Sequence, residues 1–284
     1  MDDNKKKSFD EYWEEVHSKT EWGQYPTEHV IRFIARNYYN TERMNTRILD
    51  FGCGGGAHTW YLAREGFDVY AFDGSESAIC KLDARLQREH LKADLSVRDA
   101  LLLDYPNEYF DAVVDNFCAF NNLLEIVSSM YEEMHTILKP DGKLLTAVFG
   151  KRTDGFGTGE KLEEDTYSNL ECGTLKGRTK IHFFDINSLS KLLDECGFRN
   201  MTSFGVKFVN NAARSPGFVI AGPDVIFNFA PISFAIIPAR VVLPSPGGPY
   251  NKTWSSDSPL CFAASIYTFM LSFTFVCPMY SSKV

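Results

Sequence analysis

The sequence has no pair of cysteines spaced for a metal or a redox centre. Its seven cysteines, at positions 53, 80, 118, 172, 196, 261 and 277, form no C-x-x-C pair. Structural zinc sites and thioredoxin-like centres depend on such closely spaced pairs. We therefore expect no metal site, and separate reduced thiols of the kind found in cytoplasmic proteins.

Basic charge and an apolar N-terminus are also lacking. The 284 residues carry 29 lysines and arginines against 37 aspartates and glutamates, which gives a net charge of −8. An acidic surface repels phosphate backbones, so nucleic acid is not expected as a partner. The first residues, MDDNKKKSFDEYWEEV, contain no apolar run that could act as a secretory signal.

Charge is nearly missing from the last quarter of the chain. Residues 212–284 hold six of the 66 charged side chains and no glutamate. Two apolar runs lie there, Val225–Leu243 and Phe262–Tyr280, and neither has the periodicity of an element that packs on a sheet. We expect this tail to lie outside the folded core, as the product of a shifted reading frame after about Asn211. A C-terminal membrane anchor is the alternative, because the second run has the length of a membrane span.

Glycines are concentrated in one stretch, Arg47–Arg64, with the sequence RILDFGCGGGAHTWYLAR. A short apolar strand is followed there by Gly52, Gly54 and Gly56 and then by a helical run. Glycine permits a sharp turn and a close approach of a ligand to the main chain, and the N–H groups that open the helix face that ligand. The stretch therefore predicts a nucleotide-type cofactor site. Gly52, Gly54 and Ala57 also satisfy the dinucleotide pattern G-x-G-x-x-G/A, which leaves an NAD-dependent oxidoreductase as an alternative.

An acidic residue follows the next apolar strand, Phe67–Phe72. Asp73 lies 21 residues after Gly52, where a doubly wound fold places a carboxylate against the ribose hydroxyls of a bound nucleotide. Gly74 and Ser75 come directly after it, and Ser75 is placed to cap the following helix.

The N-terminal residues predict a helical cap. Residues 8–39 are expected to be helical, because Val30, Phe33, Ile34 and Tyr38 recur at the spacing of one buried helix face. The aromatic residues ahead of them either dock this cap on the sheet or, at Trp22–Tyr25, form a lid over the cofactor.

The carboxyl end of the predicted strand Tyr109–Asn116 should face the ligand, because parallel α/β sheets bind ligands at that edge. The residues expected near the reacting group are Asp115, Asn116, Phe117, Asn121 and Asn122. The polar segment 151–180 is expected to form a loop over the substrate pocket. A phosphate-binding loop is less favoured there, because no helix begins at its GFGTG stretch.

Five short motifs occur in one order across residues 46–211: the Asp50–Gly56 loop, the strand end at Asp73, Asp99-Ala100, the LKPDG turn at 138–142 and CGF at 196–198. Together they resemble class I S-adenosylmethionine (SAM) dependent methyltransferases, and among these the UbiE-like and tellurite-resistance-like enzymes that act on small molecules. The resemblance implies a Rossmann-like, doubly wound α/β fold whose seven-stranded sheet ends in an antiparallel strand. This domain, residues 46–211, would follow the cap, residues 1–45, and precede the tail. The implied activity is transfer of the SAM methyl group to a small-molecule acceptor, such as a glycan precursor or another metabolite.

The same resemblance assigns roles to individual residues. The glycine loop would bind the methionyl part and Asp73 the ribose, while Asp99 would accept from the adenine amino group and the Ala100 N–H would bond the ring. The cofactor-binding residues implied in this way are Asp50, Gly52, Cys53, Gly54, Asp73, Gly74, Ser75, Asp99, Ala100 and Asn116.

The sequence departs from the family at the acceptor end. Members that methylate nucleobase or glutamine amino groups carry a [DN]-P-P-[YF] tetrad, and this chain has Asp-Asn-Phe-Cys at residues 115–118, which argues against such acceptors. His17, His29, Asp115 and His182 are candidates by type for a general base, which only a protonated acceptor needs. The sequence selects none of them. A fold that binds SAM without catalysis is a further alternative.

Overall fold

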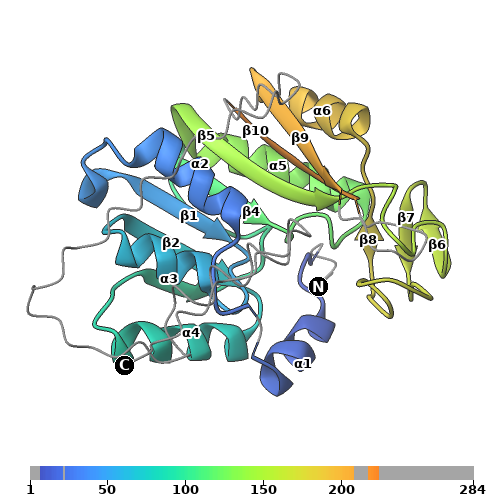
Figure 1. Ribbon diagram of the computed structural model, residues 1–284, viewed down its shortest axis with the longest axis horizontal. Helices are drawn as coiled ribbons and strands as arrows, with labels where there is room; N and C mark the ends of the chain where they lie inside the picture. Colours follow the sequence, from blue (N-terminus) through green and yellow to red (C-terminus); the bar gives the residue numbers. More distant parts are fainter. Residues whose placement is uncertain (1–6, 22, 208–216, 224–284) are drawn as a thin grey trace, which may run out of the picture. The chain divides into compact units, whose positions relative to one another are not determined.

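The computed structural model describes residues 7–21, 23–207 and 217–223 (Figure 1). Most of the tail predicted from residue 212, and the lid residue Trp22, lie outside the described residues. The helices are α1 Glu11–Lys19, α2 Glu28–Tyr38, the short 3₁₀ helix η1 Arg43–Asn45, α3 Ala57–Arg64, α4 Glu76–Arg88, α5 Leu124–Ile137 and α6 Ile186–Glu195. The strands are β1 Arg47–Phe51, β2 Asp68–Asp73, β3 Asp94–Val97, β4 Phe110–Asn116, β5 Leu138–Phe149, β6 Glu160–Glu163, β7 Thr166–Ser168, β8 Ile181–His182, β9 Met201–Lys207 and β10 Gly217–Pro223.

The central sheet is a doubly wound parallel sheet, as the sequence predicts. Strands β1 to β5 lie in the order β3-β2-β1-β4-β5, and each neighbouring pair is parallel. Because β1 pairs with β2 on one side and with β4 on the other, the chain changes direction between β1 and β4. Open α/β sheets bind ligands at the carboxyl ends of the strands beside such a switch point.

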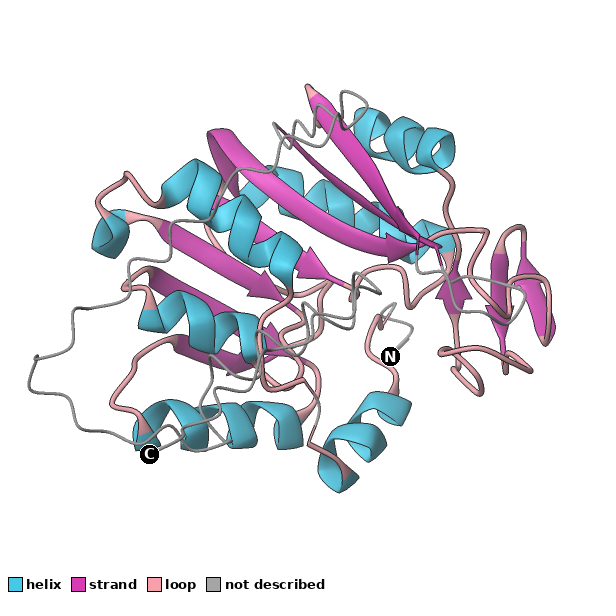
Figure 2. Ribbon diagram, in the orientation of Figure 1, coloured by secondary structure: helices cyan, strands magenta, loops and turns pink. Residues whose placement is uncertain are grey.

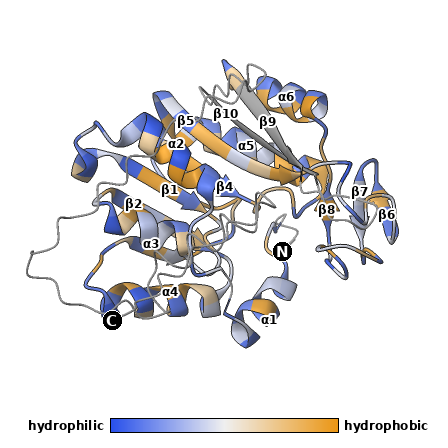
Figure 3. Cartoon of the chain, viewed as in Figure 1, coloured by the Kyte–Doolittle hydropathy of each residue, from blue (hydrophilic) through white to orange (hydrophobic). Residues whose placement is uncertain are grey.

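Alternating side chains place helices on both faces of the sheet (Figure 2). Ile48 of β1 packs with buried residues of α2 and α3, whereas its neighbour Leu49 packs in the cluster that contains the buried residues of α5 and α6. Successive residues of a strand point to opposite faces, so a strand that is apolar throughout is buried on both sides. Figure 3 shows apolar colour over much of β5, and both polar and apolar stretches on the helices.

The predicted helical cap consists of two helices, and Pro26 lies two residues before the start of the second. The chain leaves α1 at Lys19 and enters α2 at Glu28. Gly23 adopts a φ of +49° in the break, and Pro26 has no N–H to continue a helix. The predicted buried face of α2 is confirmed, because Val30, Phe33, Ile34 and Tyr38 are all buried and lie in one core cluster with Ile48 of β1.

The segment between β5 and α6 contains strands that the sequence does not predict. β6 and β7 lie within the predicted loop 151–180. β6 pairs antiparallel with β7, and β7 pairs antiparallel with β8, in a small sheet of order β6-β7-β8. In the helix after it, α6, Asp185 is the N-cap and its side chain accepts from the N–H groups of Asn187 and Ser188.

The main sheet continues beyond residue 211, where the sequence places the end of the domain. β10 pairs antiparallel with β5, for example Val219 with Val148, and also antiparallel with β9. The sequence analysis assigns these β10 residues to the tail, and the structure pairs them with the main sheet. Searched over the described ranges alone, the chain contains no helix with the length and apolarity needed to cross a bilayer.

Candidate functional site

A cavity of about 540 Å³ lies at the carboxyl ends of β1, β2, β4 and β5. This volume is within the roughly 300–1,000 Å³ typical of small-molecule sites. The glycine loop, residues 52–56, forms part of its wall, and α1 contributes Trp13 and His17. The far wall comes from residues 116–118 after β4 and from Thr174, Leu175 and Arg178 of the inserted segment.

The glycine loop has a geometry that other residues would not permit. Gly52 and Gly54 have φ values of +65° and +49°, a region that L-residues rarely adopt. A Cβ at Gly52 would collide with the Cys118 sulfur, and one at Gly54 would lie 3.3 Å from His17 Cε1. Within the loop, the Cys53 N–H donates to the Phe72 carbonyl at 2.9 Å and the Gly54 N–H donates to Asp73 Oδ2 at 2.8 Å. Of the loop carbonyls, those of Cys53 and Gly56 accept from the Gly56 and Trp60 N–H groups, each at 2.9 Å.

Asp73 lines the cavity at the end of β2. It is 8% exposed, and its second oxygen, Oδ1, accepts from the Ser75 N–H at 2.9 Å. Burial raises the pKa of Asp73, while the hydrogen bonds from Ser75 and Gly54 act in the opposite direction. Each carboxylate oxygen can accept a further hydrogen bond. Asp73 is therefore equipped to receive two hydroxyl groups of a ligand.

Two predicted contact residues lie behind the cavity wall rather than in it. Asp50 is 1% exposed and its Oδ2 accepts from the Thr59 N–H at 2.9 Å and from the Thr59 hydroxyl at 2.6 Å. Burial raises the pKa of Asp50 to about 6. These bonds join the end of β1 to the first turn of α3. Ser75 caps α4 by accepting from the Ala78 N–H at 3.1 Å, as the sequence predicts.

Asp99 also lies behind the wall, because the N-terminal segment covers it. Its oxygens accept from the Ser8 N–H at 2.9 Å, the Ser8 hydroxyl at 2.7 Å, the Phe9 N–H at 2.9 Å and the Leu101 N–H at 3.0 Å. Burial would raise the pKa of Asp99, but these hydrogen bonds outweigh it and hold the pKa below its usual value. Ala100 does line the cavity, and its N–H donates to the Ser8 hydroxyl at 3.2 Å.

At the end of β4, Asn116, Phe117, Asn121 and Asn122 line the cavity as expected. Asp115, however, is completely buried and is not among the lining residues. Its Oδ1 accepts from the N–H groups of Cys118 and Ala119 at 3.0 and 3.1 Å, and its Oδ2 accepts from the Thr146 hydroxyl at 2.6 Å. Burial raises the pKa of Asp115 to about 6. The residue holds the turn that carries Asn116–Cys118.

Thr146→Val is expected to lower the free energy of unfolding by about 1–3 kcal/mol, because it leaves a buried carboxylate oxygen unsatisfied. The Tyr131 hydroxyl, 2.9 Å from the Thr146 hydroxyl, loses its partner as well. Urea denaturation measures the change. Thr136→Val is the matched control, because the Thr136 hydroxyl bonds a carbonyl on the exposed side of α5. Equal effects from both substitutions would contradict the structural role given to Asp115.

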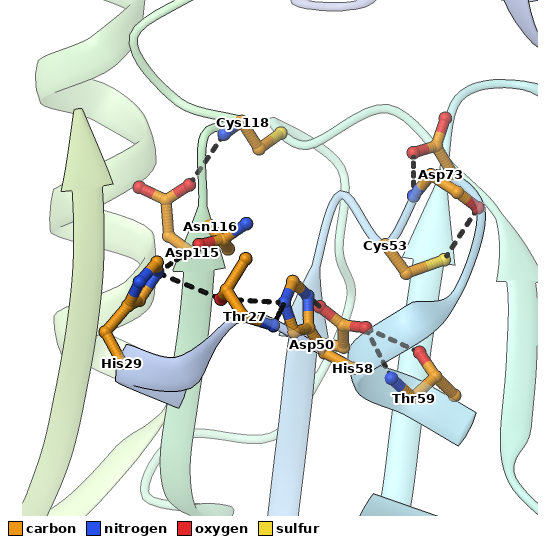
Figure 4. Close-up of polar contacts among 11 residues, drawn as sticks. Thr27, His29, Asp50, Cys53, His58, Thr59, Asp73, Asp115, Asn116 and Cys118 are labelled. Atoms are coloured by element: carbon orange, nitrogen blue, oxygen red, sulfur yellow. Dashed lines mark hydrogen bonds and ion pairs between the residues drawn. The ribbon is translucent and has the colours of Figure 1, made fainter. Parts of the chain in front are cut away.

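Two neutral histidines connect α2, α3 and the end of β4 (Figure 4). His29 Nε2 lies 2.6 Å from Asn116 Oδ1 and 3.1 Å from the Thr27 hydroxyl, which is in turn 3.2 Å from His58 Nε2. Burial lowers the pKa of both histidines to about 4. An amide oxygen only accepts hydrogen bonds, so His29 donates to Asn116 Oδ1. The NH₂ group of Asn116 is thereby directed away from His29, on a residue that lines the cavity.

The four candidates for a general base, all within the described residues, are placed differently. His17 lines the cavity over the glycine loop, and His29 reaches it through Asn116. Burial lowers the pKa of His17, and the charges of Asp73 and Glu14 partly offset this effect. His182 lies outside the lining, buried against the Thr166 hydroxyl at 2.6 Å.

Acid is expected to destabilise the fold through His29. Its pKa is about 4 in the folded protein against 6.5 when exposed, so below pH 6.5 the unfolded chain binds a proton that the folded chain does not. The contribution of neutral His29 to the free energy of unfolding is complete above pH 6.5. It is lost as the pH falls toward 4, by about 3 kcal/mol in total. Denaturation of wild type and His29→Asn between pH 7 and 4 measures it, because the variant should lose less stability.

The control for this titration is His90→Asn, which replaces an exposed histidine at a φ of +56° that asparagine tolerates. If the free energy of unfolding of wild type and of His29→Asn falls equally between pH 7 and 4, His29 does not titrate as its burial requires.

Several lining residues were not predicted from the sequence. Phe9 and Trp13 come from the cap, and Trp13 stacks on His17 with ring centroids 6.1 Å apart. The Arg178 guanidinium lies 4.7 Å from the Trp13 ring. The predicted position of segment 151–180 over the pocket indicates that some of its residues line the cavity, but nothing in the sequence of the segment identifies Arg178 as one of them. Of the predicted lid, Tyr25 lines the cavity and is 61% exposed.

The chain is similar to known methyltransferases in sequence. Residues 48–142 match the family model described as a methyltransferase domain. The chain is 26% identical over 168 residues to a ubiquinone biosynthesis O-methyltransferase of Dinoroseobacter shibae, covering 57% of this chain and 63% of the relative. It is 31% identical over 127 residues to thiocyanate methyltransferase 1 of Brassica oleracea, covering 44% and 55%. A match to the mitochondrial arginine-hydroxylase NDUFAF5 of Rattus norvegicus, 25% over 192 residues, covers 63% and 49%. The chain thus spans about half to two thirds of the length of these relatives.

Solved structures with the same fold include a SAM-dependent methyltransferase from Methanosarcina mazei, with a TM-score of 0.55 and 24% identity over 66% of this chain and 95% of the other. The 1,6-didemethyltoxoflavin N1-methyltransferase of Burkholderia thailandensis, solved with its substrate and S-adenosylhomocysteine, has a TM-score of 0.51 and 20% identity over 69% and 76%. At these identities the likeness is one of fold.

Proposed function

We propose that this chain, which carries a class I SAM-dependent methyltransferase domain, transfers the methyl group of SAM to a small-molecule acceptor. The observation that carries the proposal is the meeting of the glycine loop and Asp73 in one cavity beside the β1–β4 switch point. The loop follows β1 and Asp73 ends β2, so the two are positioned by paired parallel strands. We also infer that β9 and β10 complete the seven-stranded sheet with an antiparallel last strand.

The residues present fit this cofactor. A Cβ at Gly52 or Gly54 would meet a neighbouring side chain, so these glycines would let the cofactor approach the main chain closely. The two acceptor oxygens of Asp73 match the two ribose hydroxyls. Gly52, Cys53, Gly54, Asp73, Gly74, Ala100 and Asn116 line the cavity and are proposed to contact the cofactor. Asp50 and Ser75 would act on the site through the loop and the α4 cap, and Asp99 is covered by Ser8 and Phe9.

SAM supplies an activated methyl group on a sulfonium, so the protein mainly has to align an acceptor with it and exclude water. The part of the cavity wall beyond Asn116 is formed by Phe117, Phe120 and Phe149, with ring centroids of neighbouring pairs 4.8–6.1 Å apart. These rings favour an acceptor with a flat apolar part. The Asn116 NH₂ group would donate a hydrogen bond to an acceptor oxygen.

Binding and methyl transfer can be tested separately. Titration calorimetry with SAM, S-adenosylhomocysteine and NADH should show binding of the first two and none of the third. Labelled methyl should then pass from SAM into a small molecule of a host-cell extract, with the product identified by mass. Binding of NADH alone would favour the oxidoreductase alternative, whereas cofactor binding without transfer would favour a non-catalytic protein.

A further inference from the structure

We propose that Ser8 and Phe9 occupy the place of the cofactor's adenine base, so that the N-terminal segment, residues 7–10, competes with SAM for the site. The inference rests on the proposed function, because it takes SAM as the ligand. It assigns a regulatory contact to a part of the chain outside the glycine loop.

The order of the strands fixes where the base would lie. The glycine loop follows β1 and Asp73 ends β2, which pairs with β3 on its other side. A nucleoside with its ribose at Asp73 and its sulfonium end at the loop, beside β4, extends its base in the opposite direction. That direction leads to the end of β3. Asp99 and Ala100 lie there, two and three residues after the end of β3 at Val97.

Asp99 and Ala100 together form a complement to one edge of adenine. The exocyclic amino group of adenine donates hydrogen bonds, and the ring nitrogens accept them. A carboxylate next to a main-chain N–H offers the opposite pair. In the structure, the Ser8 hydroxyl makes both of these bonds, because it donates to Asp99 Oδ1 at 2.7 Å and accepts from the Ala100 N–H at 3.2 Å. One hydroxyl thus satisfies the donor–acceptor pair that would recognise the base.

Phe9 fills the space beside this pair. A Cβ at Gly74 would collide with the Phe9 ring, so the ring packs directly on the main chain next to Asp73. The Phe9 N–H also donates to Asp99 Oδ2 at 2.9 Å. The N-terminal segment therefore covers both the polar edge that would read the base and a surface on which its flat face would rest.

The segment can leave while α1 stays in place. Glu14 of α1 accepts from the hydroxyls of Ser75 and Ser77 at 2.6 and 2.5 Å, and the Lys81 ammonium donates to the Thr20 carbonyl at 3.0 Å. These contacts hold α1 on α4 from its second turn onward. Ahead of them, a 3.5 Å ion pair joins Asp10 to Lys180. Release of residues 7–10 would therefore bend the chain at the start of α1.

Competition by the segment predicts that weakening it strengthens cofactor binding. The apparent dissociation constant equals the intrinsic one divided by the fraction of molecules in which the segment is open. Ser8→Ala removes the hydroxyl that bonds a carboxylate, and it should tighten S-adenosylhomocysteine binding about tenfold in calorimetry. Phe9→Ala should act in the same direction. Ser18→Ala is the matched control, because the Ser18 hydroxyl bonds the Glu15 carbonyl at the exposed end of α1.

Hydrogen exchange of a peptide spanning residues 7–13 gives a second readout. In wild type, S-adenosylhomocysteine should speed exchange there while it slows exchange in the glycine loop, because the ligand expels the segment. In Ser8→Ala the peptide should exchange faster without any ligand. Unchanged or weaker binding by Ser8→Ala, or slower exchange of this peptide with ligand, would overturn the proposal and leave the proposed function intact. Failure of wild type and both variants to bind the ligand would instead refute the proposed function.

Discussion

Gly54→Val is expected to remove measurable SAM binding. Gly54 has a φ of +49° and a Cβ there would lie 3.3 Å from His17 Cε1. Valine branches at Cβ, so its two methyl groups would extend from this crowded point into the cavity that Gly54 lines. A left-handed backbone also costs an L-residue about 1–2 kcal/mol of stability. Calorimetry with SAM measures the loss of binding, and thermal unfolding shows how much of the fold remains.

The control for this substitution is Gly66→Val. Gly66 has a φ of +86° at the end of α3, with no atom within 4 Å of its ideal Cβ position. Valine there meets the same kind of backbone strain without entering the cavity. The two variants should lose similar stability, while Gly66→Val keeps its cofactor. Normal affinity in Gly54→Val would remove the glycine loop from the proposed site.

Asp73→Ala is expected to have the next largest effect. Its two oxygens would each bond a ribose hydroxyl, and hydrogen bonds to a charged group are worth roughly 1.5–3 kcal/mol each. Losing both should weaken SAM binding about 10²–10⁴-fold. The substitution also removes the acceptor of the Gly54 and Ser75 N–H groups, so the loop itself should loosen.

A second carboxylate separates these effects from general destabilisation. Asp111 accepts from the Arg47 N–H at 2.8 Å and pairs with the Lys139 ammonium at 2.8 Å. It lies near the start of β4, at the edge of the sheet opposite the cavity. Asp111→Ala should lower stability and leave SAM affinity unchanged. If both variants lose affinity in proportion to their stability, Asp73 is a structural residue only.

The sequence predicts the glycine loop and the strands on either side of it well, because the information is local. The apolar strand before Gly52 and the acidic end of the next strand stand within 27 residues of one another, and both features have a direct physical reading. The break between α1 and α2 carries the same kind of signal in Gly23 and Pro26.

Contacts between distant segments are what the sequence does not show. Ser8 and Asp99, whose side chains form a hydrogen bond, are 91 residues apart in the sequence. A serine in a polar N-terminal stretch does not indicate such a partner. Asp115 was expected near the acceptor because it ends a strand. Successive residues of a strand point in opposite directions, so a shift of one residue decides whether a carboxylate at the strand end faces the cavity or the turn behind it. Here Asn116 lines the cavity and Asp115 holds the turn.

The place of β10 has a consequence for the order in which the chain is made. β10 lies between β5 and β9, so among the described strands β9 joins the main sheet through β10 alone. While the ribosome has released residues up to 207 but not yet 223, the edge of β5 and the whole of β9 have no strand to pair with. An unpaired edge of this kind is a template for association with other chains. An expression fragment that stops at residue 211 would keep that edge open for its lifetime, whereas one that continues past residue 223 would close it.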